Sequence, residues 1–294
     1  MAILLETINL EKRYKQVKAV NGVSFAVEQG ACFGILGPNG AGKTTTIEVI
    51  EDVIPPTSGE ILYKGAPRTQ SFREEVGIQF QNTALFSYLT VRETLKTFQA
   101  LYHHTYELDE LIHMFSLEGF IDQMNDRISG GQKQRFMMAL ALINTPELIF
   151  LDEPSTGLDP QSRRNLWQVI ERIKQTGKTI ILTTHYMEEA QILCDEIAIM
   201  DNGRIIAQGT PEALIREYGR EVTVILPKES FKTPLDRFPL PLVNTGNQVK
   251  IKTNDVNNCL ETLIAQQVNL KEMVVRSPNL ENVFLNLTGR QLRE

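Results

Sequence analysis

The chain opens with short runs of apolar or alternating residues, separated by residues that favour turns. Alternation with a period of two predicts half-buried β-strands, and glycine or asparagine between the runs predicts where the strands break. Residues 1 to about 68 are therefore expected to be rich in β-structure. The expected strands span Leu4 to Leu10, Val23 to Val27 and Cys32 to Leu36, with breaks at Asn21-Gly22, Gly30 and Gly37.

From about residue 85 to residue 141 the pattern becomes helical. Thr90 and Glu93 have the spacing of a capping box, in which each side chain accepts a hydrogen bond from the other residue's backbone. This segment is expected to form a helical subdomain. The apolar residues of its first helix recur on one face, at Val91, Leu95, Phe98 and Tyr102.

Two later runs, Leu148 to Leu151 and Thr179 to Leu182, are apolar throughout. Such runs are typical of strands buried in a parallel sheet. Between them, Asp159-Pro160 favours a helix start, with aspartate as the cap and proline at the first helical position. The alternation of strand and helix predicts an α/β domain with a mostly parallel sheet.

The pattern changes again near Tyr218-Gly219, after which strands and helices become short. We expect two domains, a large one over residues 1–219 and a small C-terminal α+β domain over residues 220–294. The expected strands of the small domain are Glu221 to Leu226, Val249 to Thr253 and Met273 to Arg276, and its expected helices are Val256 to Gln267 and Asn279 to Leu287.

Composition and charge exclude some classes of function. The 294 residues carry a net charge of −6, so the chain has no general excess of basic residues for binding nucleic acid. Cys32, Cys194 and Cys259 lie far apart in the sequence, and we expect them to be free thiols in a reducing compartment.

Neither a secretion signal nor a membrane-spanning segment is expected. The opening MAILLETINL lacks a basic start and a long apolar core. A transmembrane helix needs about 18 consecutive apolar residues, and no run reaches that length. The expectation is a cytoplasmic protein, anchored by another polypeptide if it works at a membrane.

A glycine-rich loop follows the third expected strand and opens a helix. It matches the P-loop pattern GxxxxGK[ST], in which backbone N–H groups and the positive end of the helix bind phosphates. In this pattern Lys43 neutralises the β- and γ-phosphates, and the Thr44 hydroxyl binds Mg²⁺. A merely flexible loop would not explain the order of strand, loop and helix. The residues expected to bind nucleotide here are Gly37, Pro38, Asn39, Gly40, Ala41, Gly42, Lys43, Thr44 and Thr45.

The apolar strand Leu148 to Leu151 ends in two carboxylates, Asp152 and Glu153. Acids at the end of a buried strand are costly unless they serve a cation or a reaction. Asp152 is suited to hold Mg²⁺, and Glu153 is suited to polarise an attacking water. The alternative is an exposed loop start, which the P-loop upstream disfavours.

The run Ile128-Ser129-Gly130-Gly131-Gln132 resembles the LSGGQ signature of ABC-type ATPases, with isoleucine in place of the usual leucine. Ser129 and Gln132 also have capping-box spacing, and the glycines between them let a phosphate approach a helix N-terminus. In the family, the signature completes the ATP site of the opposing subunit. The resemblance covers residues 3 to 218 and implies a P-loop cassette with a mostly parallel core sheet, an antiparallel β subdomain and a helical subdomain.

The remaining motifs of the family follow in order. Gln81 matches the glutamine that contacts Mg²⁺ and senses the transmembrane partner, and Ser155 to Asp159 resembles the D-loop, which communicates across the dimer. His185 matches the switch histidine that contacts the γ-phosphate, although a solitary histidine at a strand end is more often structural. Tyr14 lies where the family has an aromatic ring that stacks on adenine, with packing as the alternative role.

The resemblance thus implies ATP and Mg²⁺ as ligands. The expected catalytic residues are Lys43, Glu153 and His185, and the expected metal ligands are Thr44, Gln81 and Asp152. The further nucleotide-binding residues are Tyr14, Gln81, Ser129, Gly130, Gly131, Gln132, Asp159 and His185.

Two stretches indicate the subtype. The run from Thr184 to Ala190 looks like the ABC-2 class of exporter ATPases, and the tail from Pro278 to Gly289 resembles drug-exporter ATPases of the daunorubicin-resistance type. This implies a second copy or a paralogue as partner, a separate polytopic permease and no nucleic acid. Leu85, Phe86 and Tyr88 are expected either to meet the permease or to pack within the domain.

A soluble regulatory or mechanical ATPase of the same family is the alternative. DNA-repair members resemble the family but insert long coiled coils between P-loop and signature, and the short distance from Lys43 to Ser129 leaves no room for them. Translation-factor members carry two cassettes, and this chain has one. Both observations favour the exporter.

Overall fold

The computed structural model describes residues 2–80, 85–219 and 221–289. The chain folds into two compact units, and the division between them falls between Pro211 and Glu212. The sequence change near Tyr218-Gly219 therefore lies a few residues after this division, inside the second unit.

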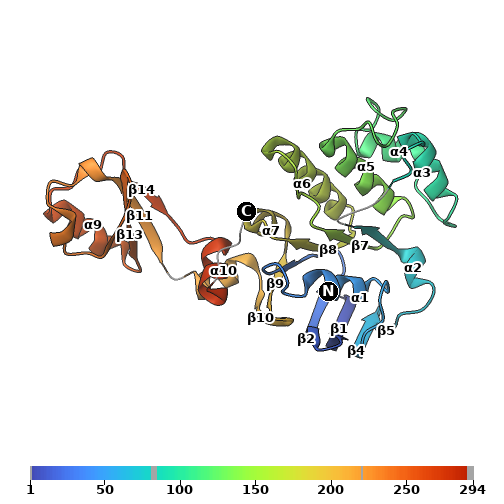
Figure 1. Ribbon diagram of the computed structural model, residues 1–294, viewed down its shortest axis with the longest axis horizontal. Coiled ribbons are helices and arrows are strands. Elements are labelled where there is room, and N and C mark those ends of the chain that lie inside the picture. The colour runs from blue at the N-terminus through green and yellow to red at the C-terminus, as the bar shows by residue number, and fades with distance from the viewer. Residues whose placement is uncertain (1, 81–84, 220, 290–294) are drawn as a thin grey trace. The chain divides into compact units, whose positions relative to one another are not determined.

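A six-stranded sheet with the order β10-β9-β3-β8-β7-β6 forms the centre of the first unit (Figure 1). Neighbouring strands run parallel from β9 to β6, and only β10 is antiparallel to its neighbour. Strands β3, β7 and β8 are buried along their whole length, which explains the apolar runs within them. The predicted α/β fold with a mostly parallel core sheet is confirmed. The strands are β3 (Cys32–Leu36), β6 (Val76–Gln79), β7 (Leu148–Asp152), β8 (Thr179–Thr184), β9 (Glu196–Asp201) and β10 (Arg204–Gly209).

An antiparallel sheet with the order β2-β1-β4-β5 accompanies the core sheet. Its strands are β1 (Ile3–Tyr14), β2 (Val17–Glu28), β4 (Ser58–Tyr63) and β5 (Ala66–Pro67). The break expected at Asn21-Gly22 is wrong, because both residues lie inside β2. The register of β1 against β2 shifts between Leu10 and Glu11, and Asn21 pairs with Glu11 at that irregularity. A β-bulge therefore absorbs the turn-forming residues without ending the strand.

Helices complete the first unit, and α3, α4 and α5 gather on the side away from β1, β2 and β4 (Figure 1). Capping boxes begin α3 and α5, at Thr90 with Glu93 and at Ser129 with Gln132, and Asp159 caps α6 ahead of Pro160, all as predicted. The first predicted helix is shorter than expected, since it ends before Tyr102. The helices are α1 (Lys43–Ile50), α2 (Phe72–Glu75), α3 (Val91–Gln99), α4 (Leu108–Met114), α5 (Gly130–Leu142), α6 (Pro160–Gln175) and α7 (Met187–Leu193).

The second unit has its own antiparallel sheet, with the order β12-β13-β11-β14, and its own apolar core. Strand β12 was not predicted, because it follows a proline-rich connection that contains two short 3-10 turns, Lys228–Ser230 and Leu235–Arg237. The elements are α8 (Pro211–Tyr218), β11 (Val222–Pro227), β12 (Leu242–Thr245), β13 (Gln248–Thr253), α9 (Val256–Ala265), β14 (Val274–Arg276) and α10 (Leu280–Thr288).

The three cysteines are buried free thiols, as predicted. Cys32 and Cys194 are remote in the sequence, yet their sulfur atoms lie 3.9 Å apart because β3 and the end of α7 are neighbours. Among the described residues, no helix is both long and apolar enough to cross a membrane.

Candidate nucleotide-binding site

The loop from Gly37 to Gly42 joins the end of β3 to the start of α1. Two glycines of this loop lie so close to the backbone of other segments that no larger residue would fit. A Cβ at Gly42, where φ is 100°, would lie 2.2 Å from the carbonyl oxygen of Ala19, and one at Gly37 would lie 2.5 Å from that of Met200. These two glycines let the loop pack closely against neighbouring backbone as it enters α1, and a glycine-rich loop at a helix N-terminus is an arrangement that binds phosphate.

Lys43 begins α1 and is only 6% exposed. Its Nζ donates hydrogen bonds to the carbonyl oxygens of Gly37 at 2.8 Å and of Pro38 at 3.4 Å. Burial lowers the pKa of Lys43, whereas the carboxylates of Glu153 and Asp152 act in the opposite direction. This electrostatic coupling joins the glycine loop and the end of β7 in one site. The neighbouring Thr44 side chain is exposed.

Asp152 is the last residue of β7 and is 7% exposed. Its Oδ1 accepts a hydrogen bond from the Thr183 hydroxyl on the adjacent strand β8. Burial raises the pKa of Asp152, and the hydrogen bond from Thr183 opposes that rise. A buried carboxylate with two oxygens and one side-chain donor of this kind suits a cation.

Glu153 has a left-handed backbone, with φ of 48°. Its N–H points back to β8, where it donates to the Thr183 carbonyl and hydroxyl oxygens, both at 3.1 Å. Because of this backbone conformation, the side chains of Asp152 and Glu153 have different neighbours. Asp152 is bonded to Thr183, whereas the Oε2 atom of Glu153 lies 3.4 Å from Nδ1 of His185. The hydrogen bond from His185 lowers the pKa of Glu153, so this carboxylate is ionised at neutral pH.

The two acids therefore differ in environment although they are adjacent in sequence. Burial favours the protonated form of Asp152, whereas hydrogen bonding favours the ionised form of Glu153. His185 follows the end of β8, and the two acids lie at the end of the neighbouring strand β7. Lys43 begins α1, the helix that follows β3 on the other side of β8. The structure brings these four predicted residues together.

The signature residues lie elsewhere in the first unit, at the start of α5. Their capping box is complete: Gln132 N–H donates to Ser129 Oγ at 3.3 Å, and Ser129 N–H donates to Gln132 Oε1 at 2.7 Å. A cavity of about 350 Å³ next to them is lined by the first turns of α5, by α6 from Ser162 to Arg172, and by Leu158 of the D-loop segment. The signature and the D-loop segment Ser155 to Asp159 thus border the same cavity.

The remaining predicted residues have mixed surroundings. Asp159 uses its carboxylate to cap α6, accepting from Gln161 and Ser162 N–H groups at 3.0 Å each. Tyr14 ends β1 with 46% of its side chain exposed, and the Lys12 ammonium lies 5.3 Å from its ring centre. Gln81 lies outside the described residues.

Thr183 is a site residue that the sequence reasoning missed. Its hydroxyl and carbonyl fix Asp152 and Glu153 in their different directions. The only signal in the sequence was a hydroxyl residue at the polar end of an otherwise apolar strand, which many buried strands share.

The chain is similar to known proteins. The family model "ABC transporter" matches residues 20–156. The linearmycin resistance ATP-binding protein LnrL of Bacillus subtilis strain 168 is 35% identical over 311 aligned positions, which cover 99% of this chain and 100% of that protein. The chain belongs to the ABC transporter family. It is an ATP-binding cassette, and cassettes of this family are ATPases.

Further relatives and structures support the same assignment. The Nod factor export ATP-binding protein I of Burkholderia lata is 37% identical, covering 97% of each chain. A solved ATP-binding subunit of an ABC transporter superposes with a TM-score of 0.66 and 31% identity, covering 74% of this chain and 93% of that one. A dimeric bacterial ABC transporter cassette gives a TM-score of 0.64 and 25% identity over 70% of this chain and 98% of its own. The relatives therefore align across both units, whereas the solved cassettes leave about a quarter of the chain uncovered.

Proposed function

We propose that this chain is the ATP-hydrolysing subunit of an ABC-2 type exporter, and that its active site is the cluster of Lys43, Asp152, Glu153 and His185. The observation that carries the proposal is the contact between Glu153 and His185, because it supplies an ionised base beside the P-loop lysine. A base that is ionised at neutral pH and placed near bound phosphates is what ATP hydrolysis requires.

ATP binds in this proposal with its phosphates wrapped by the backbone of residues 37–42 and the N-terminus of α1. The positive φ angles of Gly40 and Gly42, 81° and 100°, support this role, because they allow the tight turn of a phosphate-binding loop. Lys43 exchanges its bonds to loop carbonyls for the β- and γ-phosphates. Tyr14, whose ring is half exposed, stacks on the adenine.

The residues also fit Mg²⁺, which prefers oxygen ligands. The Asp152 carboxylate and the exposed Thr44 hydroxyl would hold it, together with Gln81. The ion would supply charge neutralisation for the transferred phosphoryl group.

Glu153 orients and deprotonates the attacking water. Its carboxylate is held by His185 Nδ1 at 3.4 Å and by the Thr156 hydroxyl at 3.2 Å. Because Nδ1 faces Glu153, the Nε2 edge of His185 remains for the γ-phosphate. The base and the switch histidine thus act as a directly contacting pair beside the reacting group.

A second copy or a paralogue completes each site in this proposal. Ser129, Gly130, Gly131 and Gln132 at the start of α5 bind the nucleotide held by the opposing P-loop. The exposed position of Ser129 and Gly130 supports this, as does the similarity to a dimeric cassette. Because ATP then contacts both subunits only in the closed dimer, its binding free energy favours closure.

Export, and a polytopic permease as partner, are proposed from the relatives, which are named for Nod factor export and linearmycin resistance. The subunit would act on the cytoplasmic side of the membrane, without nucleic acid. The alternative is a soluble regulatory or mechanical ATPase of the same family. The two hypotheses predict different co-purifying partners. An exporter subunit would co-purify with a polytopic membrane subunit, whereas a soluble ATPase would co-purify with a nucleic-acid or ribosomal partner.

Substitution of the base tests the hydrolytic assignment. Glu153→Gln keeps the size of the side chain but removes the charge that accepts a proton, so we expect ATP turnover to fall by about 100-fold or more. ATP binding and ATP-dependent dimerisation, measured by equilibrium binding and sedimentation, should persist. Lys43→Ala is the contrasting variant, because it should weaken ATP binding itself. Wild-type turnover in Glu153→Gln would rule out the role given to this residue.

A further inference from the structure

A buried carboxylate lies in the first turn of α7, just after the switch histidine. Glu189 is fully buried, and its Oε1 accepts hydrogen bonds from the Ser155 hydroxyl and, at 2.8 Å, from Nε1 of Trp167. Ser155 begins the D-loop, Trp167 belongs to α6, and Glu189 belongs to α7. One carboxylate oxygen therefore joins three separate segments of the first unit.

A burial of this kind needs a reason, because an acid without water is costly even when it is hydrogen-bonded. Burial raises the pKa of Glu189, and the donors Ser155 and Trp167 counteract it. The same packing could be made with an apolar side chain. What an apolar side chain would lack is the ability to hold the Ser155 hydroxyl and the indole N–H in fixed positions.

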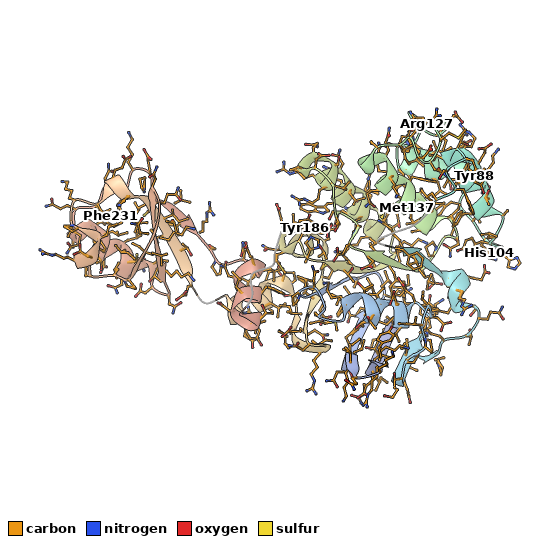
Figure 2. The ribbon with its side chains drawn as sticks, in the orientation of Figure 1. Tyr88, His104, Arg127, Met137, Tyr186 and Phe231 are labelled. Carbon is orange, nitrogen blue, oxygen red and sulfur yellow. The ribbon has the colours of Figure 1, made fainter. Side chains whose placement is uncertain are left out.

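A stack of rings and a guanidinium extends from Trp167 to the proposed site. The Arg163 guanidinium lies 5.7 Å from the Trp167 ring and 4.7 Å from the Tyr186 ring. Tyr186, labelled in Figure 2, packs in turn on His185 with 4.3 Å between ring centres. His185 therefore packs against one end of a stack whose other end, Trp167, is bonded to Glu189.

The backbone of Glu153 gives the second connection. A left-handed glutamate is strained and persists only where its surroundings over-determine it. On one side, the Glu153 N–H is tied to Thr183. On the other, Thr156 N–H donates to the Glu153 carbonyl, and the Ser155 hydroxyl between them in the chain is bonded to Glu189.

We propose that Glu189 is a positioning residue for ATP hydrolysis, which fixes Glu153 through Ser155 and His185 through Trp167, Arg163 and Tyr186. The inference rests on the proposed hydrolytic role of Glu153 and His185. It also assigns a path from the D-loop to the base: displacement of Ser155 by the opposing subunit moves both Glu153 and the start of α7. Glu189 itself touches no reacting atom.

Glu189→Gln tests the proposal, with Glu188→Gln as the matched control. The glutamine keeps the shape and one acceptor oxygen, but it places an NH2 group with two N–H donors where the second carboxylate oxygen lies, so the Ser155 hydroxyl and the indole N–H lose their fixed positions. We expect kcat to fall about 10-fold while equilibrium ATP affinity stays within about twofold, because Lys43 and the P-loop are untouched. The exposed neighbour Glu188 should give wild-type values after substitution. Wild-type kcat in a folded Glu189→Gln variant would overturn the proposal.

Tryptophan fluorescence provides a readout that a purely structural role would not move. Trp167 is the single tryptophan of the chain, so its emission reports on this network alone. ATP should change the emission of the wild type and of Glu153→Gln. In Glu189→Gln that change should be lost although ATP still binds, and an unaltered ATP-induced change would contradict the coupling.

A second pair of variants keeps the test valid if Glu189→Gln fails to fold. Ser155→Ala removes the hydroxyl and Trp167→Phe removes the indole N–H, and both leave Glu189 in place. Each variant should lower kcat. The fold-reduction of kcat in the double variant should be smaller than the product of the two single fold-reductions, because both hydrogen bonds act through one carboxylate. Full additivity, or no effect, would refute the network. If Glu153→Gln keeps its turnover while these variants lose theirs, the proposed role of Glu153 fails instead.

Discussion

At the scale of single residues, the chain holds buried acids near the end of β7 in environments that oppose ionisation. Glu51 caps the C-terminus of α1, is 4% exposed, and has a carboxylate oxygen, Oε1, without a hydrogen-bond partner. Burial, with the charges of Asp152 and Glu48, raises the pKa of Glu51 to about 8. The folded protein therefore binds a proton at this position that the unfolded chain releases near pH 4.5.

The sign of the resulting pH dependence follows from that difference. Between the unfolded pKa and the folded pKa, ionisation favours the unfolded state, and stability falls by about 1.4 kcal/mol per pH unit through this group. Glu51→Gln should therefore be more stable than the wild type at pH 7 by about 2 to 3 kcal/mol, with the gain shrinking toward pH 5. Urea unfolding in metal-free buffer at several pH values would measure it. The exposed Glu60→Gln should show no such trend, and a constant difference across pH would contradict the explanation for Glu51.

Residues whose role depends on a local pattern could be predicted from the sequence, and those whose role depends on distant contacts could not. Lys43, Asp152 and His185 were found because a loop or a strand end brings a recognisable motif with it. Thr183 and Glu189 were not, because their partners lie 31 and 34 residues away on other elements. A threonine in a strand and a glutamate in a helix look ordinary until the sheet order is known.

At the scale of elements, helix starts could be predicted from local sequence, whereas the extents of strands depended on distant partners. Helix starts with side-chain caps were predicted at Thr90, Ser129 and Asp159, since a cap is a local interaction. The extent of β2 was not, because its pairing with β1 continues through Asn21-Gly22 and only the partner strand decides this. The short strand β12 was missed for the same reason: it exists through its pairing with β13.

Two equivalent capping boxes allow the role of the signature helix to be separated from its stability. Ser129→Ala and Thr90→Ala each remove a hydroxyl that accepts a backbone N–H, so each should lower the free energy of unfolding by about 1 kcal/mol. Only Ser129→Ala should also weaken ATP-dependent dimerisation in the Glu153→Gln background, because α5 is proposed to face the opposing nucleotide. Sedimentation with and without ATP would measure this. An equal loss of dimer in Thr90→Ala would mean that stability alone explains the effect.

At the scale of the whole molecule, the first unit exposes aromatic side chains that its own core does not need. Phe86 is 48% exposed and Tyr88, labelled in Figure 2, is 75% exposed. Their ring centres lie 6.1 Å apart, and both residues precede α3 in the chain. The amino-acid pattern alone leaves open whether this segment packs internally or meets a permease. The exposure of both rings favours contact with a partner, since aromatic side chains often carry a large share of interface free energy.

Tyr88→Asp should therefore detach the protein from its proposed permease. A central aromatic contact contributes about 2 kcal/mol or more, so we expect the amount of co-purified polytopic subunit to fall about 30-fold. Leu101→Asp is the matched control, because Leu101 is also largely exposed, at 68%, but lies beyond the C-terminal end of α3. Quantitative mass spectrometry of protein purified from solubilised membranes would measure both. Equal losses of the polytopic subunit in the two variants would show that Phe86 and Tyr88 have no special role in the contact. A nucleic-acid or ribosomal partner in place of a membrane subunit would favour the soluble ATPase, because ATP hydrolysis at the same site would then be coupled to a process other than transport.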